Sequence, residues 1–105
     1  MKYKLGARER LDVRNILPIE GGYKELKVTD RLHKLLAFSE TEVVEWGIDQ
    51  IGQKVNWNQE ATREVEYDLN KEDVSLIVSQ LKKLDKLGKI TLQLIPLYDM
   101  FIGEN

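Results

Sequence analysis

The chain has 105 residues, of which 42% are hydrophobic and 32% charged, and its formal net charge is -2. This length fits one domain, residues 1–105, with a single core, and the composition is far from that of disordered chains. The absence of cysteine excludes a disulfide-stapled scaffold, a thiolate nucleophile and the usual zinc-finger sites. The sequence shows neither an apolar run of membrane-spanning length nor a secretion signal, so we expect a cytoplasmic protein that contacts no membrane.

Charge is unevenly distributed along the chain. Residues 1–38 carry nine Lys or Arg and five Asp or Glu, a net +4, whereas residues 39–73 carry three and ten, a net -7. Such asymmetry can steer a charged partner or join two copies head to tail. A chain this rich in charge also shows such blocks by chance, and that is the simpler interpretation.

The first third of the sequence predicts a short strand and two helices. Residues 2–5 alternate polar and apolar side chains, as an edge strand does. Residues 7–17 have the apolar spacing of an amphipathic helix, which Pro18 ends. After a turn at Gly21 and Gly22, residues 23–38 place their leucines largely on one face of a second helix.

The acidic middle predicts a short helix followed by strands. Residues 39–42, Ser-Glu-Thr-Glu, match a capping box, so a third helix should begin there and close near Gly47. Residues 48–57 surround a turn at Gly52 and predict a hairpin. Residues 64–69 alternate strictly between acidic and apolar and predict a further strand.

The last third predicts one well-defined helix and one very apolar one. Asn70 can cap a helix whose apolar stripe runs over residues 74–84, with Gly88 as its left-handed C-cap. A final helix should run from Thr91 to Ile102, with Pro96 in its first turn or at a kink. Its apolar residues are too many for one buried stripe, so it is either central to the core, which we favour, or partly docked on another chain.

These elements predict an α+β fold. Four or five helices should pack on a small antiparallel sheet formed by the hairpin and the strand at residues 64–69. The strand at residues 2–5 is a possible further member of that sheet.

The sequence shows no set of residues suited to catalysis. His33 is the only histidine, which is too few for a zinc site, and Ser39 is explained by its capping role. Gly21 and Gly22 lack the Lys-Ser/Thr pair of a phosphate-binding loop. The paired carboxylates of the strand at residues 64–69 lie on its solvated face. We therefore predict no enzymatic activity, no cofactor and no metal site.

Contacts with a protein partner are the leading hypothesis. We expect Trp46 in the core and leave Trp57 open between core and interface, because tryptophans serve both roles. The candidate partner-binding residues are the aromatic and acidic side chains of Trp57, Tyr98, Phe101, Glu40, Glu42 and Glu45.

Nucleic-acid binding is the alternative hypothesis. A strand, three helices and a hairpin follow one another as in a winged-helix protein. The helix in the recognition position is acidic, however, and phosphate contact requires cations. The alternative therefore depends on the basic N-terminal third, in which Arg8, Arg10 and Arg14 are the candidate contacts.

Several short segments resemble a group of small, mostly uncharacterised proteins of bacteriophages and prophages of Gram-positive bacteria. The segments are Ala7-Arg8-Glu9-Arg10-Leu11, Leu17-Pro18-Ile19-Glu20-Gly21-Gly22, Leu26-Lys27-Val28, Phe38-Ser39-Glu40, Trp57-Asn58-Gln59-Glu60 and Leu81-Lys82-Lys83-Leu84-Asp85. The resemblance implies a phage origin and expression inside the infected bacterium. It implies no activity and assigns no site residue.

Together these observations predict a non-enzymatic phage accessory protein that binds another protein. The partner is either a second copy, bound through the apolar C-terminal segment, or a host factor, bound through the acidic middle. Salt distinguishes the two, since apolar self-association survives high ionic strength and binding through an acidic face weakens with it.

Overall fold

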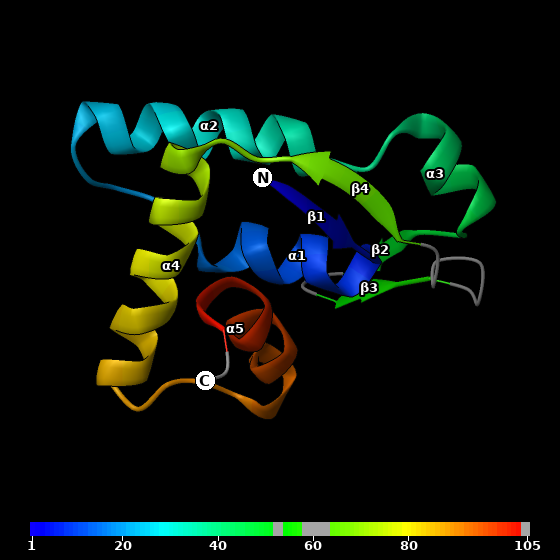
Figure 1. Ribbon diagram of the computed structural model, residues 1–105. Helices are drawn as coiled ribbons and strands as arrows, with labels where there is room; N and C mark the ends of the chain where they lie inside the picture. The colour runs from blue at the N-terminus through cyan, green and yellow to red at the C-terminus, as the bar shows by residue number, and fades with distance from the viewer. Residues whose placement is uncertain (52–53, 58–63, 104–105) are drawn as a thin grey trace.

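The computed structural model describes residues 1–51, 54–57 and 64–103 and confirms the α+β class. These residues form five α-helices and four strands (Figure 1). In chain order the elements are β1 (Lys2–Leu5), α1 (Ala7–Ile16), α2 (Tyr23–Leu36), α3 (Glu40–Glu45), β2 (Asp49–Ile51), β3 (Lys54–Asn56), β4 (Val65–Asp68), α4 (Lys71–Lys86), the 3-10 helix η2 (Leu92–Leu94) and α5 (Ile95–Ile102). The predicted turn at Gly52 lies outside the described residues.

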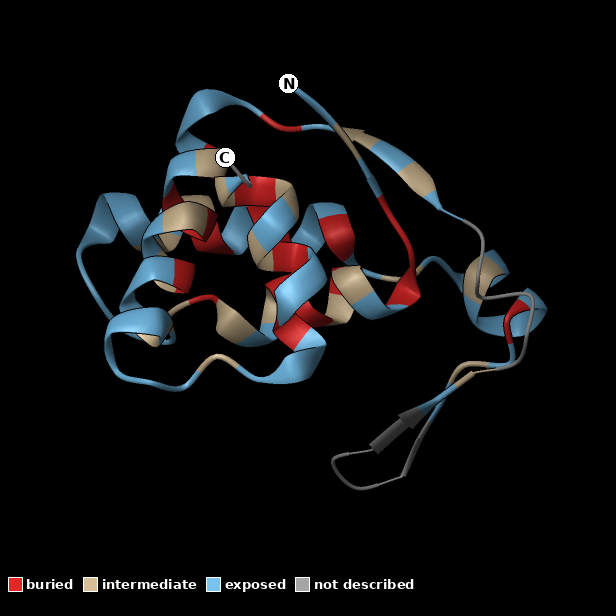
Figure 2. Cartoon of the chain, turned by 60° about the horizontal axis from the view of Figure 1, so that its bottom comes forward, coloured by how far each residue is buried: buried red, intermediate tan, exposed pale blue. Residues whose placement is uncertain are grey.

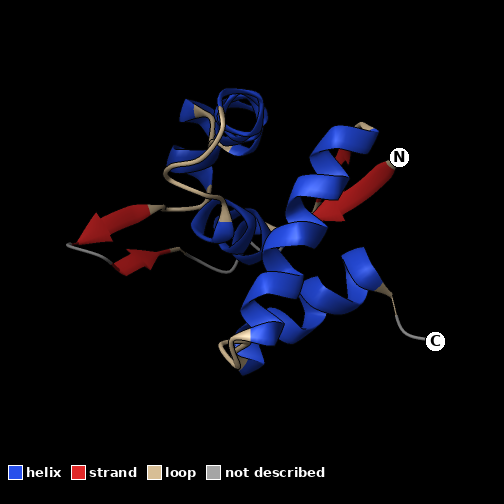
Figure 3. Ribbon diagram, turned by 90° about the vertical axis from the view of Figure 1, so that its left-hand side faces the viewer, coloured by secondary structure: helices blue, strands red, loops and turns tan. Residues whose placement is uncertain are grey.

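The strands form two separate antiparallel pairs rather than the single sheet expected from the sequence. β1 pairs with β4, with Tyr3 opposite Tyr67, and β2 pairs with β3. The backbone N–H of Leu69 extends the first pair by donating to the carbonyl of Met1 over 2.7 Å. The strands β2 and β3 project from the helices (Figure 3). The alternation of polar and apolar residues predicts where a strand lies, but it does not predict which strands pair.

The predicted capping box at Ser39 and the predicted cap at Asn70 both start their helices as expected. Ser39 Oγ accepts from the backbone N–H of Glu42 over 3.1 Å, and Glu42 Oε1 accepts from the N–H of Ser39 over 2.9 Å. Asn70 and Asp73 make the same reciprocal pair at the start of α4, over 2.9 and 3.0 Å. Each box satisfies two donors that a helix N-terminus otherwise leaves unpaired.

The core lies around α1, which contacts α2, α4, α5 and β1. Buried faces of these elements point inward (Figure 2). The C-terminal segment contributes Leu94, Leu97 and Phe101, and the Phe101 ring stacks on Tyr3 with centroids 4.5 Å apart. The expectation that this segment belongs to the core is confirmed for that face. The segment starts as a 3-10 turn, and the α-helix begins only at Ile95, because Pro96 fits a first helical turn.

A buried arginine joins α1 to the elements that follow. The side chain of Arg10 is 1% exposed, and its Nη1 and Nη2 donate to the two carboxylate oxygens of Glu42 over 2.7 and 2.9 Å. Its Nε donates to the carbonyl of Leu36 over 3.2 Å and its Nη2 to that of Ala37 over 2.8 Å. The guanidinium also lies 4.4 Å from the centroid of the Phe38 ring. One side chain therefore links α1, the end of α2 and α3.

Replacing Arg10 with methionine should strongly destabilise the protein. The substitution leaves two carbonyls without their donor and the carboxylate of Glu42 with the N–H of Ser39 alone, which we expect to lower the free energy of unfolding by roughly 3 kcal/mol. Arg8→Met is the matched control on the same helix, where the side chain is exposed, and should cost under about 1 kcal/mol. Urea denaturation of both variants measures the difference, and equal losses would contradict the assigned role of Arg10.

The ion pair between Arg10 and Glu42 should make the free energy of unfolding depend on pH. Hydrogen bonds from Arg10 lower the pKa of Glu42 below its ordinary value of 4.5. A lowered carboxyl pKa gives stability that is present above the ordinary value and is lost as pH falls through the folded-state value. The difference in unfolding free energy between wild type and Glu42→Gln should therefore be largest at neutral pH and shrink below pH 4.5.

Urea unfolding across that pH range measures the effect. Glu40→Gln, on the exposed side of the same helix, is the control and should change the unfolding free energy by under about 0.5 kcal/mol at neutral pH. If the difference in unfolding free energy between wild type and Glu42→Gln stays constant with pH, the charge of the carboxylate contributes nothing to stability.

Candidate functional site

An open groove lies between the first half of α2 and the first turns of α4, at the left of Figure 1. It has a volume of about 880 Å³. Val28 and Leu76 form its apolar floor and continue into the main core. Tyr23, which is 77% exposed, stands at its edge. The full lining is Tyr23, Lys24, Glu25, Lys27, Val28, Arg31, Lys71, Glu72, Ser75 and Leu76.

The rim of this groove carries an excess of positive charge. Lys24, Lys27 and Lys71 lie along it, and no salt bridge among the described residues involves any of the three. The ammonium of Lys27 lies 5.7 Å from the centroid of the Tyr23 ring. Two carboxylates, Glu25 and Glu72, also line the groove and offset part of the charge. The groove thus offers an apolar floor beneath a cationic rim.

An ion pair between α2 and α4 fixes the groove. Arg31, on the α2 wall, donates to the carboxylate of Asp73 in the first turn of α4. The side chain of Asp73 is 0% exposed, whereas that of Arg31 is 46% exposed. The other carboxylate oxygen of Asp73 is held by the capping box with Asn70. The two walls of the groove are therefore tied together.

Removing the cation of this pair should loosen the groove. Arg31→Met leaves the buried carboxylate of Asp73 with its backbone donor alone, and we expect the free energy of unfolding to fall by about 1–3 kcal/mol. Lys34→Met is the matched control, because the pair that Lys34 makes with Asp30 on the same helix is exposed, and should cost under about 1 kcal/mol. Urea denaturation distinguishes them, and indistinguishable losses would show that the Arg31–Asp73 pair does not hold the walls.

The acidic residues predicted to bind a partner do not form one contact surface. Glu42 turns inward to Arg10, so it builds the fold rather than a contact surface. Glu40 and Glu45 are exposed on α3. The structure thus corrects the expectation that Glu42 binds a partner, while Glu40 and Glu45 stay candidates.

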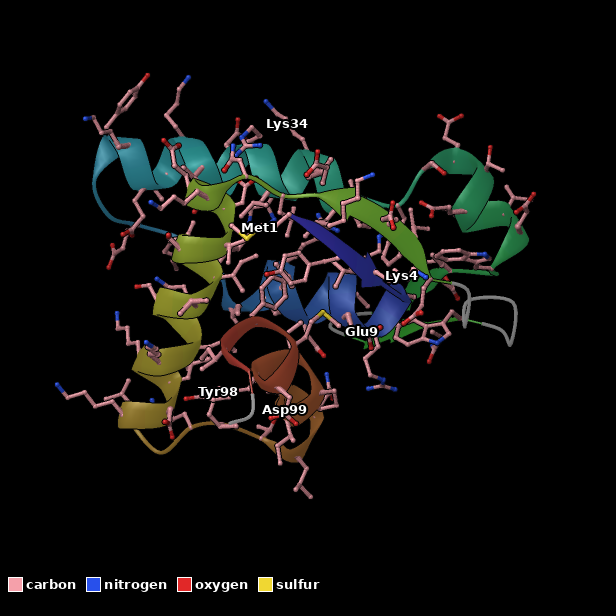
Figure 4. All side chains as sticks on the ribbon, in the orientation of Figure 1. Met1, Lys4, Glu9, Lys34, Tyr98 and Asp99 are labelled. Carbon is pink, nitrogen blue, oxygen red and sulfur yellow. The ribbon has the colours of Figure 1, made fainter. Side chains whose placement is uncertain are left out.

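The aromatic candidates are also separated. Phe101 is 8% exposed and belongs to the core, contrary to its expected place at an interface. Tyr98 is half-buried on α5, and its hydroxyl donates to Asp85 over 3.3 Å beside a small groove of about 210 Å³ (Figure 4). Trp57 is half-buried and packs against the small cluster of Ala7 and Trp46, in which Trp46 is buried as expected. None of the three predicted aromatic residues lines the α2–α4 groove.

The basic candidates do not form a continuous surface. Arg10 is interior, which corrects the expectation that it could meet a phosphate backbone, and Arg14 is half-buried. Arg8 is exposed, with its guanidinium 5.6 Å from the centroid of the Trp57 ring. The helices and hairpin do follow one another in winged-helix order, but among the described residues β1 pairs with β4 and not with the hairpin.

Sequence reasoning missed the α2–α4 groove because its walls lie far apart in the chain. Lys24 and Lys27 were visible only as polar positions off the apolar face of α2, and Lys71 carried no signal. Only the contact between α2 and α4 brings them to one rim. Nothing in the spacing of these residues indicates that contact.

The described part of the chain also limits what the site can be. It contains no group of three or more His, Cys, Asp or Glu residues placed to hold a metal ion. No helix within it is long and apolar enough to cross a membrane. Comparison of the chain with protein-family models, curated proteins and solved structures found no match. The phage resemblance and the functional expectations therefore stay predictions.

Proposed function

We propose that this chain is a non-enzymatic accessory protein that acts by binding another protein through the α2–α4 groove. The observation that carries the proposal is the apolar floor of Val28 and Leu76 beneath a rim of lysines that make no salt bridge among the described residues. Such a surface is complementary to a protein segment that presents an apolar side chain beside carboxylates. The proposed phage origin and action in the host cytoplasm are supported by the sequence resemblance alone.

The form of the groove favours a protein segment over a small molecule. Small-molecule sites enclose most of the ligand and hold a few polar groups in fixed positions. Here the groove is open, and no hydrogen bond among the described residues orients the ammonium groups of Lys24, Lys27 or Lys71. Lysines that no hydrogen bond holds in place can adjust their positions to a protein partner whose structure is already fixed.

The proposal of a non-enzymatic role is supported by what the polar groups already do. Ser39 caps α3, and Glu42 binds Arg10. Asp12 accepts from Nε2 of Gln93 over 2.5 Å, while burial raises the pKa of its carboxyl. His33 is half-buried on α2, and burial lowers its pKa. None of these four groups lines the groove.

Nucleic-acid binding stays the alternative proposal. The winged-helix order of α1, α2, α3 and the hairpin favours it. The acidic α3 and the burial of Arg10 count against it, because phosphate contact needs exposed cations on the reading surface. Salt-sensitive retention on DNA that Arg8→Ala abolishes would favour this alternative over the groove.

Selection from a random displayed-peptide library tests the groove. Peptides are selected on immobilised wild type and then measured on the groove variant Lys24→Glu/Lys27→Glu, whose changes are confined to exposed side chains. We expect the selected peptides to combine acidic and apolar residues and to bind the groove variant at least about tenfold more weakly, because two attractive rim charges become repulsive.

Lys82→Glu/Lys83→Glu is the matched control, since it reverses two exposed charges at the far end of α4. It should leave peptide binding unchanged. Backbone amide shifts in α2 and the first turn of α4 should report the bound peptide. Equal binding to all three proteins, or shifts confined to other elements, would overturn the groove as the binding surface.

A further inference from the structure

The helix α3 presents a second surface that the fold itself does not use. It has no buried residue in its six positions, and Glu42 ties it to Arg10 of α1. Val44 is 80% exposed and Val43 is 39% exposed. A short helix held at the surface with exposed valines offers an apolar contact to something outside the chain.

The Arg10–Glu42 pair decides which side of α3 faces outward. Two positions along a helix rotate a side chain by roughly 200°, and four positions bring it back to within roughly 40°. Glu40 and Val44 therefore lie together on the side of α3 that faces away from Glu42. Since Glu42 is held inward by Arg10, the outer side presents a carboxylate next to an apolar side chain.

This outer side of α3 is chemically complementary to the α2–α4 groove. The groove offers an apolar floor under lysines, and the helix offers an exposed valine beside an exposed glutamate. The two surfaces lie at opposite ends of the molecule, α3 at the right and the groove at the left of Figure 1. A contact between them therefore joins two molecules rather than two parts of one.

We propose that the partner in the groove is a second copy of this chain, whose α3 inserts Val44 against Val28 and Leu76 while Glu40 meets the lysine rim. The proposal rests on the proposed function of the groove and names its occupant. Because the two contacting surfaces differ, a joined pair of molecules still has one free groove and one free α3. Such a head-to-tail contact extends into open chains or closes into a ring.

The contact should be weak and sensitive to salt. One short helix in one groove buries less surface than a standard stable interface, so assembly should appear only as protein concentration rises. Opposite charges at an exposed rim are screened strongly once the Debye length falls from about 10 Å at 0.1 M salt to about 3 Å at 1 M. The average mass of the wild type should therefore rise with concentration past that of a dimer and fall when salt is added.

Two variants that each lose a different surface provide the test. Val44→Lys removes the outer face of α3 and keeps the groove, whereas Lys24→Glu/Lys27→Glu removes the cationic rim and keeps α3. All three positions are exposed, so folding should be preserved, which circular dichroism and thermal unfolding check. Sedimentation velocity measures each protein alone and an equimolar mixture, across concentration and at low salt.

Each variant alone should stay monomeric at concentrations where the wild type assembles. In the mixture, the groove of Val44→Lys can still accept the α3 of Lys24→Glu/Lys27→Glu, and no further contact is possible. The mixture should therefore form a heterodimer and stop at that size. This limit separates a head-to-tail contact from a symmetric dimer, in which the same surface serves both copies.

Leu92→Lys is the matched control, because Leu92 is 86% exposed at the other apolar end of the chain. It should assemble as the wild type does. Loss of assembly in Leu92→Lys but not in Val44→Lys would place self-association at the C-terminal segment and overturn the proposal. A wild type that stays monomeric at every concentration would also overturn it, while peptides selected by the groove would leave the proposed function standing.

Discussion

The burial of one cation, Arg10, is the constraint on which the rest of the structure depends. Taking a guanidinium out of water costs several kcal/mol unless acceptors replace the lost hydration. The acceptors here are the carboxylate of Glu42 and the carbonyls of Leu36 and Ala37 at the end of α2. Carbonyls at a helix C-terminus lack partners and carry partial negative charge, so a buried cation and a helix end satisfy each other.

This arrangement divides the molecule into two differently charged ends. α2 begins at the groove, where Lys24 and Lys27 belong to the cationic rim, and it ends with the carbonyls to which Arg10 donates. The acidic α3 follows next along the chain. At one end Asp73 fixes the walls of the groove, and at the other Glu42 fixes the outer face of α3. In each ion pair at least one partner is buried, Arg10 in the first and Asp73 in the second, and each pair positions one of the two proposed contact surfaces.

Local features of the fold could be predicted from the sequence and contacts between distant elements could not. The capping box at Ser39 and the cap at Asn70 were recognisable because capping depends on residues within one helical turn. The partner of β4 was not, since alternation carries no information about pairing. Arg10 was taken for a surface cation because a charged residue is rarely fully buried. Its acceptor Glu42 lies 32 residues away, and no local pattern links the two.

Hydrogen exchange of the arginine side-chain Nε–Hε groups, followed by ¹⁵N–¹H spectroscopy, tests the central role of Arg10 most directly. Its Nε–H donates to the carbonyl of Leu36 and is closed to solvent, whereas Arg8 is exposed. Exchange at Arg10 must then wait for an opening of the structure. The account predicts a rate at least about tenfold slower than at Arg8. Equal rates would show that the guanidinium is not buried and that the link between α1, α2 and α3 does not exist.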